Sequence, residues 1–177
     1  MFQGLEAREV GTWDKGLELE KVLGLLREKL KTSEGAEYSY LAVLITQARN
    51  GCRVGEALAG VLAFAESGAR EQRVRIEKRK DGAERLVIIP AEVERERLDK
   101  QSLRLASVKM YAKRKLGINT HSLRYAWITA QAKDNVNPAI IASITGHKNL
   151  NMLMHYIQKK QGEECLRAQL QSTLEVS

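Results

Sequence analysis

Side chains suited to phosphate chemistry gather in one stretch of the sequence, from His121 to Tyr156. All three histidines lie in it; His121 precedes Arg124 by three positions, and His147 precedes Tyr156 by nine. A guanidinium can hold a phosphate through paired hydrogen bonds, an imidazole can move a proton near neutral pH, and a phenol can act as a nucleophile. The stretch has no carboxylate cluster, so the pattern predicts a site that handles a phosphodiester without a metal ion.

The charge balance points to a polyanionic partner. The 177 residues include 29 Lys and Arg against 22 Asp and Glu, which gives a net charge of +7 and an isoelectric point near 9.5. Nucleic acid is the leading partner class for such a chain. Charge alone leaves open the alternative of an ordinary basic enzyme.

The remaining composition favours a reducing, intracellular setting. Cys52 and Cys165 form neither a CxxC motif nor a metal-binding spacing with the histidines. The sequence has no run of about 18 apolar residues and no signal peptide. We therefore expect a soluble, cytoplasmic protein without a membrane span, with residues 1–15 as a lead-in to a single domain.

Helices must position most of this chemistry. Apolar residues recur with helical spacing in several segments, and Asn50-Gly51, Gly117 and Gly146 supply turn or termination signals. Pro138 suits the first turn of a helix, and Asn149 or Asn151 can begin the helix that carries Tyr156. The expected helices cover residues 17–31, 36–49, 91–98, 102–116, 121–132, 138–144 and 163–174.

Strands are expected only in the middle of the chain, at 61–64, 74–78 and 86–89. The last two flank Asp81-Gly82, a strong hairpin signal. The predicted fold class is therefore α+β, a mainly helical domain with a small three-stranded antiparallel sheet. The hairpin tip carries Lys78, Arg79 and Lys80, which a hairpin can project toward a phosphate, although a solvated basic tip is the usual arrangement.

Arg53 follows the Asn50-Gly51 turn, at the start of another helix. Glu56, three positions later on the same face, can hold its guanidinium by a charge-assisted pair. Taken alone, such a pair is more often a weak surface ion pair.

In order and identity, four short segments resemble the signature of the tyrosine recombinase (phage-type integrase) family. They are the segment around Arg53, the run His121-Ser122-Leu123-Arg124, Gly146-His147 and Tyr156. The resemblance spans residues 17–157, and four segments in register are far more specific than one. Thr145 stands where a leucine commonly precedes Gly-His in the family, and Tyr125 where a second histidine often follows the arginine.

The resemblance implies an enzyme and a role for each reacting group. Tyr156 would attack the scissile phosphate to give a 3′-phosphotyrosine, while Arg53 and Arg124 hold the non-bridging oxygens. His121 and His147 would donate hydrogen bonds to the phosphate or move the tyrosine proton. The implied acid that protonates the 5′-oxygen is Lys80, with Lys78 as the alternative, and Glu56 would support Arg53. Lys78 and Arg79 are the expected DNA contacts.

The resemblance also implies partners and domain organisation. The substrate would be double-stranded DNA, with no metal, ATP or other cofactor, and the protein would act as a homotetramer on DNA and be monomeric without it. Residues 16–177 would form the catalytic domain, without the N-terminal domain that clamps DNA in the family. A type IB topoisomerase and an inactive DNA-binding relative are the alternatives; His155 is expected at the surface or near DNA, and delivery of Tyr156 in cis or in trans stays open.

Overall fold

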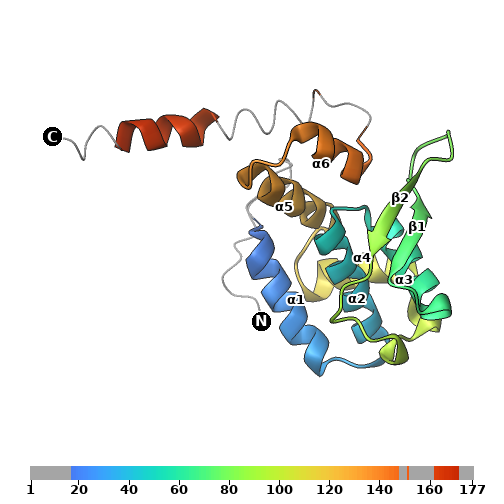
Figure 1. Cartoon of the computed structure of the whole chain (residues 1–177). Helices are drawn as coiled ribbons and strands as arrows, with labels where there is room; N and C mark the ends of the chain where they lie inside the picture. Colours follow the sequence, from blue (N-terminus) through green and yellow to red (C-terminus); the bar gives the residue numbers. More distant parts are fainter. Residues whose placement is uncertain (1–16, 148–150, 152–161, 172–177) are drawn as a thin grey trace.

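The computed structural model describes residues 17–147, 151 and 162–171, and most of these residues are helical (Figure 1). Five of the six α-helices of residues 17–147 lie close to predicted segments, because the sequence periodicity that predicted them reflects burial; α3 is the exception. The six helices are α1 (Leu19–Thr32), α2 (Gly35–Asn50), α3 (Val54–Ser67), α4 (Leu105–Lys115), α5 (Thr120–Lys133) and α6 (Pro138–Thr145). Residues 162–171 are also helical.

Helix α2 forms the centre of the domain. Its buried residues lie on all sides, in a continuous run from Leu41 to Ala48, so it has no solvent-facing stripe over this part. Helices α1, α3, α4 and α5 all contact it. The end of α2 therefore places the turn at Gly51, and the arginine that follows it, against the core.

The sheet has two strands among the described residues, β1 (Glu71–Arg75) and β2 (Glu84–Ile88), paired antiparallel with Val74 opposite Arg85 (Figure 1). The mainly helical class with a small antiparallel sheet is confirmed, but the third strand is wrong. Residues 61–64 lie inside α3, where Val54, Ala57, Leu58 and Val61 are buried at three- and four-residue spacing. A short apolar run is compatible with a strand, whereas the three- and four-residue spacing of buried residues over the longer segment is that of a helix.

The predicted helix at residues 91–98 is also wrong. This segment contains the single 3₁₀ turn Arg95–Arg97, and Lys100–Ser102 forms another turn soon after. Tertiary hydrogen bonds hold the segment instead: the Glu94 backbone N–H donates to the Tyr38 hydroxyl at 2.8 Å. These contacts outweigh a modest local helical preference.

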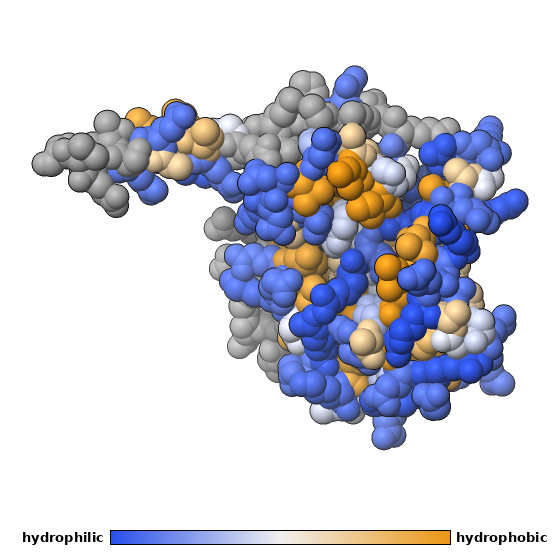
Figure 2. All heavy atoms as spheres, in the orientation of Figure 1, coloured by the Kyte–Doolittle hydropathy of each residue, from blue (hydrophilic) through white to orange (hydrophobic). Residues whose placement is uncertain are grey.

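Some apolar surface stays uncovered on the face that carries α6 and β2. Figure 2 shows apolar patches over these elements, where Ile140, Ile144, Leu86 and Ile88 are exposed. Within the described ranges, no helix is long and apolar enough to cross a membrane.

A close approach at Gly51 joins the end of α2 to α5. Gly51 has φ of 58°, and a Cβ added to it would lie 2.3 Å from a ring carbon of Trp127. Trp127 is on α5, the helix that also carries Arg124. Only glycine combines this backbone conformation with so close a ring.

Replacing Gly51 should therefore cost more stability than replacing a glycine that needs only its backbone conformation. We expect Gly51→Ala to lower the free energy of unfolding by roughly 2 to 4 kcal/mol, from backbone strain and displacement of Trp127. Gly117, with φ of 66° and no atom within 4 Å of an added Cβ, is the matched control. Gly117→Ala should cost about 1 kcal/mol. Urea unfolding measures both, and equal losses would contradict the packing role of Gly51.

Candidate active site

Arg53 is the residue that immediately precedes α3, where the chain leaves the Gly51 turn. Its backbone N–H donates to Glu56 Oε2 at 3.0 Å, and its Nη1 donates to Glu56 Oε1 at 3.2 Å. The side chain of Glu56 is fully buried, whereas that of Arg53 is 23% exposed. Unlike an ordinary surface ion pair, this pair has a buried carboxylate, while its guanidinium remains partly accessible to a ligand.

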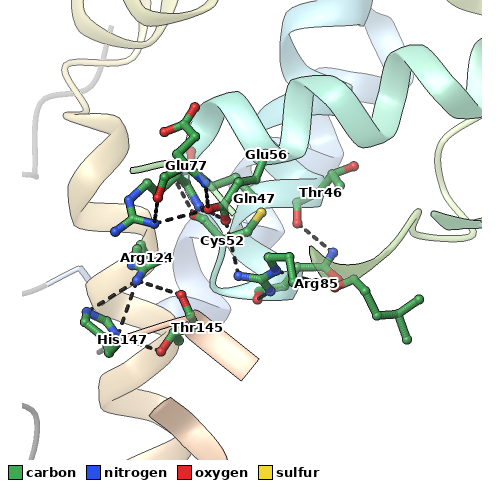
Figure 3. Close-up of polar contacts among 12 residues, drawn as sticks. Thr46, Gln47, Cys52, Glu56, Glu77, Arg85, Arg124, Thr145 and His147 are labelled. Carbon is green, nitrogen blue, oxygen red and sulfur yellow. Dashed lines mark hydrogen bonds and ion pairs between the residues drawn. The ribbon is translucent and has the colours of Figure 1, made fainter. Parts of the chain in front are cut away.

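Glu56 also binds the hairpin. The Glu77 backbone N–H donates to Glu56 Oε1 at 3.1 Å, and the Arg53 guanidinium donates to the Glu77 carbonyl at 3.2 Å. Both backbone groups of Glu77, the residue just before Lys78, are therefore hydrogen-bonded to the Arg53–Glu56 pair. Figure 3 shows Glu77 beside Glu56, with several polar contacts meeting at the Glu56 carboxylate.

Lys78 follows that anchored residue in a left-handed conformation, with φ of 64°, which is uncommon for a residue with a side chain. Within the described residues no hydrogen bond or ion pair holds its side chain, which is exposed, as is that of Lys80. Arg79 forms an ion pair with Asp81, so part of its charge is offset locally. Lys80 is exposed, and no hydrogen bond or ion pair holds it within the described part of the chain.

Arg85, on β2, is a residue that the sequence analysis missed. Its side chain is 3% exposed, and its Nη1 donates to Glu56 Oε2 at 3.4 Å while its Nη2 donates to the Asn50 carbonyl at 2.7 Å. In the strand alternation Arg85 shares the buried face with Val87. An arginine on the apolar face of a predicted strand was the available signal, because a buried cation requires a partner.

Arg124 on α5 is 1% exposed, so its guanidinium lies inside the protein. Its Nη2 donates to the Thr145 carbonyl at 2.9 Å and lies 3.3 Å from both ring nitrogens of His147. Its Nη1 is buried and has no hydrogen-bond partner among the residues that the structure describes. Buried donors are rarely left unpaired, so this atom can donate to an acceptor that enters the site.

His147 follows α6, which ends at Gly146 with φ of 72°. Its Nδ1 lies 2.6 Å from the hydroxyl of Thr145, which is fully buried (Figure 3). A hollow of about 470 Å³ between the hairpin and α6 is lined by His147, Ile76, Arg79 and Ser143. His147 is thus held on one side by Arg124 and Thr145 and opens on another toward the hairpin.

Positive charge exceeds negative charge at this site. Arg53 and Arg85 form ion pairs with Glu56, and Arg124 lies within electrostatic reach of it, so among these four groups three positive charges face one negative charge. Burial, followed by the charge of Arg53, lowers the pKa of Arg124 to about 10, so it stays charged at neutral pH. The arrangement has the charge of an anion-binding site.

The excess of positive charge also lowers the pKa of the two described histidines. Burial is the main cause that lowers the pKa of His147 from 6.5 to about 4, and Arg124 and Arg53 add to it. Burial likewise lowers the pKa of His121, with contributions from Arg124, Arg53 and Lys78. Both imidazoles are therefore neutral at pH 7. The involvement of Lys78 places its charge within electrostatic reach of His121.

The structure thus brings together Arg53, Glu56, His121, Arg124 and His147, which are far apart in sequence, and sets Lys78 close to them. Lys80 and Arg79 lie farther along the hairpin turn. Tyr156, His155 and the helix expected to carry them lie outside the described residues.

A family model and a curated relative both indicate one family. Residues 61–163 match the model of the Phage integrase family. A protein of Acidianus two-tailed virus named "Putative integrase ORF241" is 39% identical over 168 residues, which cover 89% of this chain and 68% of that protein. "Uncharacterized protein MJ0770" of Methanocaldococcus jannaschii is 32% identical over 197 residues, covering 89% of this chain and 88% of that protein. No solved structure matches the chain.

The lowered pKa of His147 predicts how stability depends on pH. As pH falls below 6.5, the unfolded chain binds the His147 proton before the folded protein does. The stability that this neutral imidazole contributes is therefore complete above pH 6.5 and is lost as pH falls toward 4. Titration of the His147 ring by NMR in the free protein should give a midpoint near 4. A midpoint near 6.5 would contradict the described surroundings of the ring.

Proposed function

This chain belongs to the phage integrase family of site-specific recombinases, and on that premise we propose that it cleaves and rejoins double-stranded DNA through a 3′-phosphotyrosine intermediate. One observation carries the proposal: the buried Arg124 Nη1 has no partner within residues 17–147, 151 and 162–171, and it lies in a site with excess positive charge. A scissile phosphate supplies both an acceptor and negative charge. Its non-bridging oxygens gain charge in the transition state, where preorganised donors stabilise it most.

Each group of the site has a part in this chemistry. Arg53 and Arg124 bind the non-bridging oxygens, and Glu56 keeps Arg53 in place. The Tyr156 oxygen attacks phosphorus, the bond to the 5′-oxygen breaks, and that oxygen takes a proton from a hairpin lysine. The phosphodiester energy is kept in the protein–DNA link, so rejoining is the same step in reverse with a 5′-hydroxyl as nucleophile.

Lys78 is favoured over Lys80 as the acid. Lys78 follows the residue that Glu56 and Arg53 hold, and its charge acts on His121. Lys80, exposed like Lys78, lies two residues farther along the turn from the anchored Glu77. Lys80 and Arg79 are then left to contact the DNA backbone. The functional assembly is a homotetramer that holds two DNA duplexes.

The nucleophile is tested by trapping. A duplex nicked close to the cleavage site loses the short fragment that carries the 5′-hydroxyl, so rejoining fails and the covalent complex accumulates. We expect such a complex on a denaturing gel with the unaltered protein and none with Tyr156→Phe, which should still bind DNA. Tyr111→Phe is the control, since the Tyr111 hydroxyl bonds Glu37, away from the site. Equal trapping by Tyr156→Phe would overturn the assignment. Relaxation of supercoils without any joining of two sites would instead indicate a topoisomerase.

The two lysines are separated by matched substitutions. Lys78→Gln should slow single-turnover cleavage by roughly 100-fold or more, because a general acid typically contributes that much. Lys80→Gln should stay within about threefold of the unaltered rate, since it removes one exposed phosphate contact. A substrate with sulfur in place of the 5′-oxygen needs no proton to depart, so it should restore cleavage by Lys78→Gln. The reverse pattern would assign the acid to Lys80.

A further inference from the structure

Gln47 is a buried amide on the central helix α2, where its side chain is 1% exposed. Two other buried polar side chains of this helix bond back to the helix itself. The hydroxyls of Ser39 and Thr46 donate to the carbonyls of Gly35 and Ala42. The Gln47 amide instead reaches out of its helix, and a buried polar group in such a place requires partners.

Its partners are two backbone carbonyls from different parts of the chain. Gln47 Nε2 donates to the Thr120 carbonyl at 2.8 Å and to the Cys52 carbonyl at 3.3 Å. Thr120 is the first residue of α5 and precedes His121, while Cys52 precedes Arg53. One NH₂ group therefore bonds the backbone directly before two residues of the candidate site.

The chemistry of the partners fixes the orientation of this amide. Its NH₂ group has two hydrogens and meets two carbonyl oxygens that can only accept, so one hydrogen serves each. Exchanging the amide oxygen and nitrogen would set an oxygen against both carbonyls. Within residues 17–147, 151 and 162–171, Gln47 Oε1 has no hydrogen-bond partner. An apolar residue would avoid the cost of burying that oxygen, so core stability alone does not explain a glutamine here.

The glutamine joins two units of the site. Arg53 is bound to Glu56 and to the Glu77 carbonyl, which makes it part of the unit that also holds the hairpin. His121 belongs to the first turn of α5. Gln47 links the two units through the residue before each, and its own backbone lies in the buried stretch of α2.

The two linked residues lie close to one another in the fold. Burial, the charge of Arg124 and then that of Arg53 lower the pKa of His121, so Arg53 is within electrostatic reach of the ring. Two donors can bind one phosphate only when their separation suits it. A displacement of about 1 Å at such a site can cost a large factor in rate.

We propose that Gln47 is a positioning residue that holds Arg53 and His121 at the separation needed to bind one phosphate together. This inference rests on the proposed function and adds to it a residue too buried to touch the DNA. The bonds to the Cys52 and Thr120 carbonyls set the separation before the substrate arrives. Donors preorganised in this way stabilise the charge that develops on the phosphate.

The link is tested first in the DNA-free protein, by NMR titration of the His121 ring. Gln47→Met has a side chain of similar length without an N–H, so both bonds are lost. His121 should then lie farther from Arg53 and be less buried, and its pKa should rise toward 6.5. Thr46→Val is the matched control: it removes a buried hydroxyl that bonds its own helix and should leave the His121 pKa unchanged. The same His121 pKa in Gln47→Met as in the unaltered protein would overturn the proposal.

A second measurement needs no variant. In the unaltered protein, NMR should detect a coupling across the 2.8 Å hydrogen bond, between Gln47 Nε2 and the Thr120 carbonyl carbon. Both side-chain hydrogens of Gln47 should exchange slowly with solvent, because both are buried and bonded. Rapid exchange of either hydrogen, or no coupling to Thr120, would refute the link even if Gln47→Met did not fold.

Cleavage of the nicked duplex tests the consequence for the reaction. Single-turnover cleavage by Gln47→Met at saturating DNA should be roughly 10- to 100-fold slower, because two donors are misplaced. DNA affinity should stay within about threefold, since many phosphate contacts supply it. Thr46→Val should cleave near the unaltered rate. Weaker DNA binding with an unaltered rate at saturation would contradict a positioning role.

A double variant separates positioning from a general loss of stability. If Gln47 acts in part through His121, Gln47→Met should slow cleavage by a smaller factor in the His121→Ala background than in the unaltered protein. Equal factors in the two backgrounds would show that the glutamine does not act through His121. If Tyr156→Phe still trapped DNA, the proposed function would fail, while the His121 titration would still decide the link by itself.

Discussion

The buried carboxylate of Glu56 is the constraint on which the site depends. A charge with no solvent contact is tolerated only when donors surround it, and here they come from three segments: the start of α3, the entry to the hairpin and strand β2. One carboxylate therefore fixes the Arg53 guanidinium, the backbone before Lys78 and the Arg85 side chain relative to one another. Glu56 thereby joins the start of α3 to the hairpin, although the two are far apart in sequence.

The excess of arginine over carboxylate gives this unit its chemical character. Folding places Arg124 in the interior with one unpaired nitrogen and keeps both described histidines neutral. Such an arrangement lowers stability without substrate, because like charges repel and a buried donor lacks an acceptor. The same features would stabilise a phosphate as its charge grows, without reorganising the protein. The features that lower the stability of the free protein are thus the ones that prepare the site to bind an anion.

Local patterns in the sequence account for much of the fold. Helices α1, α2, α4, α5 and α6 follow apolar periodicity over ten or so residues, and the hairpin follows Asp81-Gly82. Failures occurred where the local pattern was short or where distant contacts decided. Residues 61–64 have the composition of a strand but the period of α3, and residues 91–98 are held by Tyr38 and other distant groups. Arg85 could not be identified from local patterns, because its role depends on an ion pair with Glu56, which is remote in sequence.

By itself, the sequence determined which chemistry-bearing residues are present, in what order, and on which local elements, because residue spacing and turn signals act over a few positions. It also carried the family resemblance, which the comparisons confirm. Only the tertiary structure decided how these residues meet: that Glu77 is held beside Lys78, that Arg124 is buried with a free donor, and that Gln47 bonds two distant carbonyls. The reason is physical. Hydrogen-bond direction, burial and pKa depend on groups brought together across the fold, and no local pattern encodes which distant carbonyls a buried amide will bond.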